Sequence, residues 1–316
     1  MGIFNVLFGS RDDECSSAEG PLTAQQYTDR ARKKSQRGDL PGAIADFTKA
    51  VELAPQSPAV WFNRGFTRTM MGHSATGQFE GAAADLSEAV ADFSKAIELA
   101  PRFVDAWLHR GYARSVMARG GAGQFEVAIA DFSEAVRLNA ECAPAYFERA
   151  YCHLQTGNYD QAVADYSEAL RLEPNLGDAY SNRGKAYGAK GDHDKAIADF
   201  TQAIGFDPKS AHAYRNRAIS YLAKDEYEAA ITDLTKAIRL DPDDALNNAV
   251  AYHNRGSAYA QLGQHDKARA DLAKAVSLEP YLEGQLAVPT VVVKDLDELK
   301  RVAQAAANQA RTPRDH

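Results

Sequence analysis

The sequence predicts an all-α fold built from repeated pairs of helices, and three observations support this prediction. The phrase ADFTKAVELAP (45–55) returns in six related copies along the chain. A second phrase, of the form aromatic-x-x-Arg-Gly/Ala, precedes each later copy. Pro174, Pro208 and Pro242 close three successive copies at steps of 34 residues. A fixed period of this length is the signature of a solenoid of stacked supersecondary units.

Each repeat has the residue pattern of two helices joined by a turn. In the fifth repeat, Tyr180 and Tyr187 lie seven residues apart and so share one face of a first helix. Gly191 interrupts that helix, and Phe200 lies on one face of a second. Pro208 prevents the second helix from continuing. A small residue, which lets two helices approach closely, occupies the eighth place at Gly65, Gly111, Ala150, Gly184, Ala218 and Gly256.

The two phrases also divide the chain. The predicted repeats span 24–57, 58–103, 104–142, 143–176, 177–210, 211–244 and 245–282. Residues 1–23 form an N-terminal segment that we expect to be partly disordered. Residues 283–316 hold a predicted helix from about Asp295, where Asp295 and Glu298 are spaced as a capping box, followed by a tail.

These repeats resemble the tetratricopeptide repeat family. Its pattern W-x2-L-G-x2-Y…A-x3-F…P is met in the fifth repeat by Tyr180, Gly184, Tyr187, Ala196, Phe200 and Pro208. The resemblance implies a right-handed α-solenoid of antiparallel helix pairs, whose first helices line a concave groove. It also implies a non-catalytic protein that binds peptides or proteins. The segment 283–316 resembles the capping helix that covers the last repeat of a solenoid.

The second repeat contains a duplicated heptad, ADLSEAV (84–90) followed by ADFSKAI (91–97). The preceding GQFE phrase also occurs in the third repeat, and that match places ADLSEAV in the normal position. We therefore predict a single second helix that is longer by two turns, about 10 Å, and not an eighth repeat. On the same match, Asp85 is the structural partner of Arg64, and Asp92 is the surplus residue.

The seventh place departs from the family pattern because every repeat has Arg where Leu is usual. These residues are Arg30, Arg64, Arg110, Arg149, Arg183, Arg217 and Arg255. Each repeat also has an Asp directly before the bulky residue of its second helix. The matched Asp residues favour a structural interpretation, in which Arg and Asp pair between helices. The alternative is a basic ladder for an acidic ligand.

The family resemblance assigns certain places of the first helix to the groove. The resulting candidate binding residues are Phe62, Asn63, Phe66, Leu108, His109, Tyr112, Phe147, Tyr151, Asn182, Lys185, Arg215, Asn216, His253 and Asn254. Repeats two to four would supply an aromatic half, and repeats five to seven an Asn-rich, mildly basic half that includes His212. We hypothesise that a partner segment anchors in the first half and runs along the second.

Each half has a simpler interpretation. The aromatic residues could pack against neighbouring helices, and the Asn residues could merely mark this subtype of repeat. A side-chain amide offers donors and an acceptor, so a row of them can hold an extended peptide backbone. The carboxylate clamp known from this family is not expected, because Thr28, Arg32, Asn63, Asp105 and His109 do not match its pattern.

Composition argues against several other functions. The net charge of −7 disfavours nucleic acid as the main partner. The three cysteines lack the spacing of a zinc site or a disulfide framework. We find no apolar run long enough to cross a membrane, no supported catalytic or metal-binding motif, and no sign of a cofactor.

The sequence thus predicts a cytoplasmic, non-catalytic scaffold that binds a protein or peptide segment. One alternative is a helical-repeat protein that binds RNA. Another is a membrane-associated assembly factor, peripheral to the bilayer, that uses the apolar IFNVLF stretch (3–8). That stretch could instead pack on the first repeat or occupy the protein's own groove. The partner's identity and the oligomeric state do not follow from the sequence.

Overall fold

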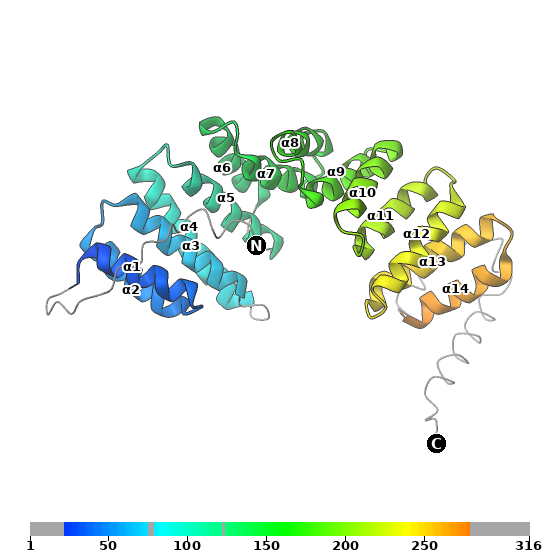
Figure 1. The fold of residues 1–316 in the computed structure, drawn as a ribbon, viewed down its shortest axis with the longest axis horizontal. Coiled ribbons are helices and arrows are strands. Elements are labelled where there is room, and N and C mark those ends of the chain that lie inside the picture. Colours follow the sequence, from blue (N-terminus) through cyan, green and yellow to red (C-terminus); the bar gives the residue numbers. More distant parts are fainter. Residues whose placement is uncertain (1–21, 75–78, 122–123, 279–316) are drawn as a thin grey trace, which may run out of the picture. The chain divides into compact units, whose positions relative to one another are not determined.

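The computed structural model describes residues 22–74, 79–121 and 124–278, which are helical apart from short turns (Figure 1). The described residues divide into two compact units, one that ends at Ala106 and one that begins at Trp107. The helices are α1 (Ala24–Gln36), α2 (Leu40–Leu53), α3 (Pro58–Ser74), α4 (Phe79–Leu99), α5 (Val104–Arg119), α6 (Phe125–Leu138), α7 (Ala143–Gln155), α8 (Tyr159–Leu172), α9 (Gly177–Ala189), α10 (His193–Phe206), α11 (Ala211–Leu222), α12 (Tyr227–Leu240), α13 (Ala245–Gln261) and α14 (His265–Leu278).

Within each unit, every helix packs against the next one in the chain. In the first unit α1 contacts α2, α2 contacts α3 and α3 contacts α4. In the second unit this order continues from α6 to α14, and the first helices α7, α9, α11 and α13 also contact one another in sequence. The predicted all-α solenoid is confirmed for the described residues. The predicted capping helix, the tail and residues 1–21 lie outside them.

The turn inside a repeat depends on one residue in the left-handed conformation. Gly191 has φ +81°, two residues after the end of α9, and Gly38, Gly157 and Gly263 take the same conformation in their repeats. The sixth repeat has Asp225 at this place, with φ 59°. Asp tolerates this region better than most residues that carry a Cβ. The prediction that Gly191 interrupts the first helix is confirmed.

The core of each repeat is formed by a small residue on the first helix and a bulky one on the second. The bulky residues are buried at Phe47, Phe93, Phe132, Tyr166, Phe200, Leu234 and Leu272. A Cβ added at Gly111 on α5 would lie 2.8 Å from Cε1 of Phe132 on α6. The close helix approach expected at the eighth place is therefore present.

We expect Gly111→Ala to lower the free energy of unfolding by about 1–2 kcal/mol, because the cost of overpacking exceeds the gain in helix propensity. Gly188→Ala on α9 is the matched control, since a Cβ there would meet no atom closer than 3.9 Å. We expect the control to raise stability by up to about 1 kcal/mol. Urea unfolding of both variants measures the difference, and a stabilising Gly111→Ala would contradict this account of the packing.

The duplicated heptad forms part of one continuous helix, as predicted. Helix α4 has 21 residues, whereas the neighbouring second helices α2 and α6 have 14 each. Helix α3 is also longer than α1, with 17 residues against 13. The two helices are joined at the ends where both are extended, so the added turns lie at the start of α4.

The assignment of the two Asp residues was wrong. Arg64 binds Asp92, with Nε at 3.0 Å from Oδ2 and Nη2 at 2.7 Å from Oδ1. The Cβ of Asp92 and the ring of Phe93 also lie against Gly65, as the corresponding atoms do in the third repeat. The physical reason is that the C-terminal half of α4, which leads to the next repeat, aligns with the other second helices, so the extra residues lie at its N-terminal end. The surplus heptad is therefore ADLSEAV, and it contains Asp85.

Candidate functional site

The Arg–Asp ladder belongs to the framework of the fold. In the fifth repeat, Nε and Nη2 of Arg183 donate to the two carboxylate oxygens of Asp199, each at 2.8 Å. Nη1 of Arg183 donates to Oγ of Ser167 in the preceding repeat at 3.0 Å. The guanidinium also lies over the ring of Tyr180, 5.5 Å from its centroid. Because these contacts occupy the guanidinium on several sides, the structural interpretation of the ladder is confirmed.

The same two-point contact with Asp recurs in every repeat. The pairs are Arg30–Asp46, Arg64–Asp92, Arg110–Asp131, Arg149–Asp165, Arg183–Asp199, Arg217–Asp233 and Arg255–Asp271. In the first three repeats a second cation joins the carboxylate, at Lys34, Arg68 and Arg114. In the last three repeats the equivalent positions hold Tyr187, Tyr221 and Tyr259, and each of these rings lies beside the ladder Arg of its own repeat.

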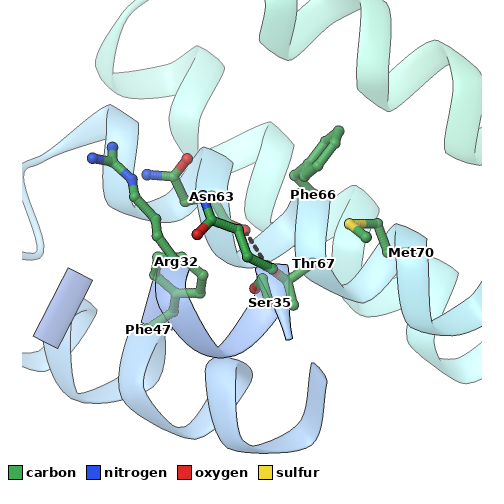
Figure 2. Close-up of a pocket in the computed structure, with 8 residues that line it drawn as sticks. Arg32, Ser35, Phe47, Asn63, Phe66, Thr67 and Met70 are labelled. Atoms are coloured by element: carbon green, nitrogen blue, oxygen red, sulfur yellow. Dashed lines mark hydrogen bonds between the residues drawn. The ribbon is translucent and has the colours of Figure 1, made fainter. Parts of the chain in front are cut away.

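A small pocket lies in the first unit (Figure 2). Its lining comes from three helices: Arg32, Ser35 and Gln36 on α1, Phe47 on α2, and Asn63, Phe66, Thr67 and Met70 on α3. Figure 2 shows the polar ends of Arg32 and Asn63 near each other, while Phe66 and Met70 lie together at the opposite side. The pocket therefore combines polar groups with an apolar surface.

The structure brings two of the predicted binding residues, Asn63 and Phe66, into this pocket. Both are partly exposed. Sequence reasoning missed Arg32, Ser35 and Met70 as lining residues. Arg32 occupies the ninth place of the first repeat, which is the place of Phe66 in the second. Extending the same rule to the first repeat would have found it.

Phe62 is not a surface residue, so its assignment to the groove is corrected. Its side chain is only 4% exposed. Its ring centroid lies 5.0 Å from that of Phe103, 5.6 Å from that of Phe93 and 6.2 Å from that of Phe66. The aromatic cluster buries Phe62 within the first unit. At this position the packing interpretation is the correct one.

The predicted aromatic residues of the second unit are partly buried. Leu108 and Tyr112 pack against the cluster around Phe132. Phe147 meets the ring of Tyr166 edge-on, with centroids 5.6 Å apart. The guanidinium of Arg119 covers Tyr151 at 4.1 Å from the ring centroid. These side chains therefore contribute to packing while each keeps some exposed surface.

Polar groups of the second unit gather where α9 lies beside α11. Lys185 Nζ donates to Oδ1 of Asn182 at 3.3 Å, and Asn216 Nδ2 lies 2.8 Å from Nε2 of His212. Arg215 reaches Asp244 at 3.5 Å. The structure thus brings together Lys185, Arg215, Asn182 and Asn216 from the predicted set. Asn254 is partly exposed on α13, whereas His253 is only 9% exposed, so little of its side chain is available to a partner.

Burial and neighbouring charge change the acid–base behaviour of several residues. Burial lowers the pKa of His109 to about 4. Burial, together with the charges of Lys185 and Arg215, lowers the pKa of His212 to about 4. The thiol of Cys152 is buried, which raises its pKa to about 11 and disfavours the reactive thiolate.

Two further classes of site have no support within the described residues. Over 22–74, 79–121 and 124–278, no group of three or more His, Cys, Asp or Glu side chains is arranged to hold a metal ion. None of the helices in these ranges combines the length and apolar character that crossing a membrane requires.

Family models and solved structures identify the repeat. Models described as tetratricopeptide repeat match residues 115–176, 181–245 and 249–281. The chain is similar to YrrB, described as "a TPR protein with an unusual peptide-binding site", at 23% identity over 63% of this chain and 93% of that one, with a TM-score of 0.52.

Two other solved structures show the same fold over more of the chain. A tetratricopeptide repeat protein from Parabacteroides merdae is 19% identical over 89% of this chain and 98% of its own, with a TM-score of 0.56. The C-terminal part of a repeat protein from Cytophaga hutchinsonii is 17% identical over 80% and 95%, with a TM-score of 0.61. No curated protein matches the sequence.

Proposed function

We propose that this chain, which belongs to the tetratricopeptide repeat family, is a non-catalytic scaffold that binds an extended segment of a partner protein on the exposed faces of its first helices. The family supports a protein-interaction role in general. The pocket between α1 and α3 is the observation that carries the finer proposal. It offers polar groups and an apolar surface within the reach of one bound segment.

The chemistry of the pocket suits a peptide. The amide of Asn63 can donate to and accept from a peptide group, while the guanidinium of Arg32 can only donate. Phe66 and Met70 provide an apolar surface, and the flexible thioether of Met adapts to differently shaped side chains. A bound segment would place one apolar side chain against this surface and its backbone beside Asn63.

The likeness to YrrB agrees with this proposal, because that protein is described as having a peptide-binding site. Other observations argue against a catalytic role. The Arg–Asp ladder is occupied by framework contacts. Cys152 is buried with a raised pKa.

Affinity capture with pocket variants tests the proposed function. We expect a partner captured by the wild-type chain to be retained at least tenfold less well by a chain carrying Asn63→Ala and Phe66→Ala, because apolar anchors dominate binding energy. Leu53→Ala is the matched control, since Leu53 is 56% exposed on α2, away from the pocket lining. Circular dichroism checks that each variant is folded. Equal retention by all three chains would contradict the proposal.

A further inference from the structure

Three basic side chains on two neighbouring helices form a cluster in the second unit. Lys185 comes from α9, and His212 and Arg215 come from α11. They lie close enough that the charges of Lys185 and Arg215 act on His212. We call these three residues the basic cluster. Unlike the ladder Arg residues, none of them forms a short bidentate pair with a carboxylate among the residues that the structure describes.

Arg215 shows this difference most clearly. Its side chain is 12% exposed, and its ion pair with Oδ2 of Asp244 is long, at 3.5 Å. Its Nη1 is buried and has no hydrogen-bond partner within the described residues. On the same helix, Arg217 donates to both oxygens of Asp233 at 2.7 and 2.8 Å. A buried charged donor without an acceptor is unfavourable, so the guanidinium of Arg215 is less well compensated than that of Arg217.

Two nearby carboxylates offset the charge of the basic cluster only in part. Asp244 caps α13 and already accepts from the backbone N and from Nδ2 of Asn247, at 3.1 and 2.7 Å. Asp178 on α9 is exposed, and its charge acts on Lys185 without an ion pair between them. Burial lowers the pKa of Lys185 despite Asp178. Burial, followed by the charges of Lys185 and Arg215, lowers the pKa of His212, as expected where the positive potential is not fully compensated.

We propose that the basic cluster binds the carboxylate of an Asp or Glu side chain in the partner segment. This inference rests on the proposed function and adds the chemistry of one position in the ligand. Asn182 and Asn216, which contact Lys185 and His212, are placed to hold the adjoining peptide backbone. The partner therefore carries an acidic residue where it crosses α9 and α11.

The charge balance favours a carboxylate over a phosphate group. Lys185 and Arg215 are positively charged at neutral pH, and Asp244 beside Arg215 offsets one of these charges. His212 is neutral there, because its pKa is about 4. Asp178 is exposed and makes no ion pair with Lys185, so Lys185 is left to pair with one singly charged carboxylate, whereas a phosphate carries closer to two negative charges.

Nuclear magnetic resonance on the full chain tests this site directly. The probe is a capped synthetic peptide of alternating Asp and Gly, and its twin has Asn in place of each Asp. We expect the acidic peptide to shift the His212 ring resonances and to raise the pKa of His212, because a bound carboxylate favours the imidazolium form. His212→Gln assigns the resonances. The Asn twin should leave them unchanged.

Substitutions then locate the contact. We expect Lys185→Gln to weaken binding of the acidic peptide about tenfold, the usual loss for one charge-assisted hydrogen bond. Lys209→Gln is the matched control, because it removes the same charge from an exposed residue in the nearby turn. Raising the salt concentration should also weaken binding.

Two results would overturn the acidic site. One is the absence of any change at His212 with the acidic peptide. The other is equal binding by the Asn twin or by the Lys185→Gln chain. Equal binding by the twin would overturn only the acidic site and would itself support peptide binding by the scaffold. The proposed function is decided separately by the pocket variants in the first unit.

Discussion

Asp92→Ala is expected to lower the free energy of unfolding by about 3–5 kcal/mol, because it leaves the buried Arg64 without a counter-charge and leaves Arg68 with only the exposed Glu88. Asp92 is 2% exposed. It binds Arg64 in a bidentate pair and also contacts Arg68. The side chains of these two Arg residues are only 11% and 13% exposed. No other ladder carboxylate holds two cations as buried as these.

Asp85→Ala in the same helix is the matched control, since it changes the same residue in the other copy of the duplicated heptad. Asp85 makes no hydrogen bond or ion pair with the described residues, and burial raises its pKa, which shows that the fold disfavours its charge. We expect Asp85→Ala to change stability by less than about 0.5 kcal/mol. Urea unfolding followed by circular dichroism measures both variants. A larger loss of stability in Asp85→Ala than in Asp92→Ala would instead support the alignment of α4 predicted from the GQFE phrase.

Acidification is expected to destabilise the protein through His109. The folded chain holds the pKa of His109 near 4, below its ordinary value of 6.5. The unfolded chain therefore binds the proton first as the pH falls. The stabilising contribution is complete above pH 6.5 and is lost as the pH drops from about 6.5 to about 4. At one pKa unit per 1.36 kcal/mol, the loss reaches at most about 3 kcal/mol.

The variant His109→Gln isolates this contribution. It replaces the imidazole with a neutral amide that does not titrate, so it should reduce the dependence of unfolding free energy on pH between 4 and 6.5 by the contribution of His109. His212, whose pKa is also lowered to about 4, continues to contribute in this chain. His265→Gln is the control, because His265 is exposed at the start of α14. We expect the control chain to keep the wild-type pH dependence. An unchanged slope in His109→Gln would show that His109 does not carry the effect.

The fold could be predicted from sequence because every repeat contains the same pattern of residues. Gly191, Phe200 and Pro208 fix a turn, a core residue and a helix end, and their counterparts do so elsewhere. The register of α4 was misjudged because the GQFE phrase was used as the reference point. Counting back from the closing proline gives the observed register, since Asp92 precedes Pro101 by nine residues, as Asp165 precedes Pro174.

The candidate site could be predicted only in part. Asn63 and Phe66 were found because the family rule names their places, whereas Phe62 was misassigned because the rule does not account for the rings of Phe93 and Phe103. Sequence spacing predicts which face of a helix carries a side chain, but not which neighbouring side chains bury it. The absence of a hydrogen-bond partner for Nη1 of Arg215 among the described residues is likewise a property of three-dimensional contacts.

Site-specific photo-crosslinking tests the central claim, that the exposed faces of the first helices bind a partner segment. A photoreactive residue is placed at Asn63 on α3 or at Asn216 on α11, and in control chains at the exposed Lys49 on α2 or Lys236 on α12. We predict that irradiation in the native cell joins a partner protein to the first-helix positions and not to the controls. Crosslinks at Lys49 and Lys236 with none at Asn63 and Asn216 would contradict the account.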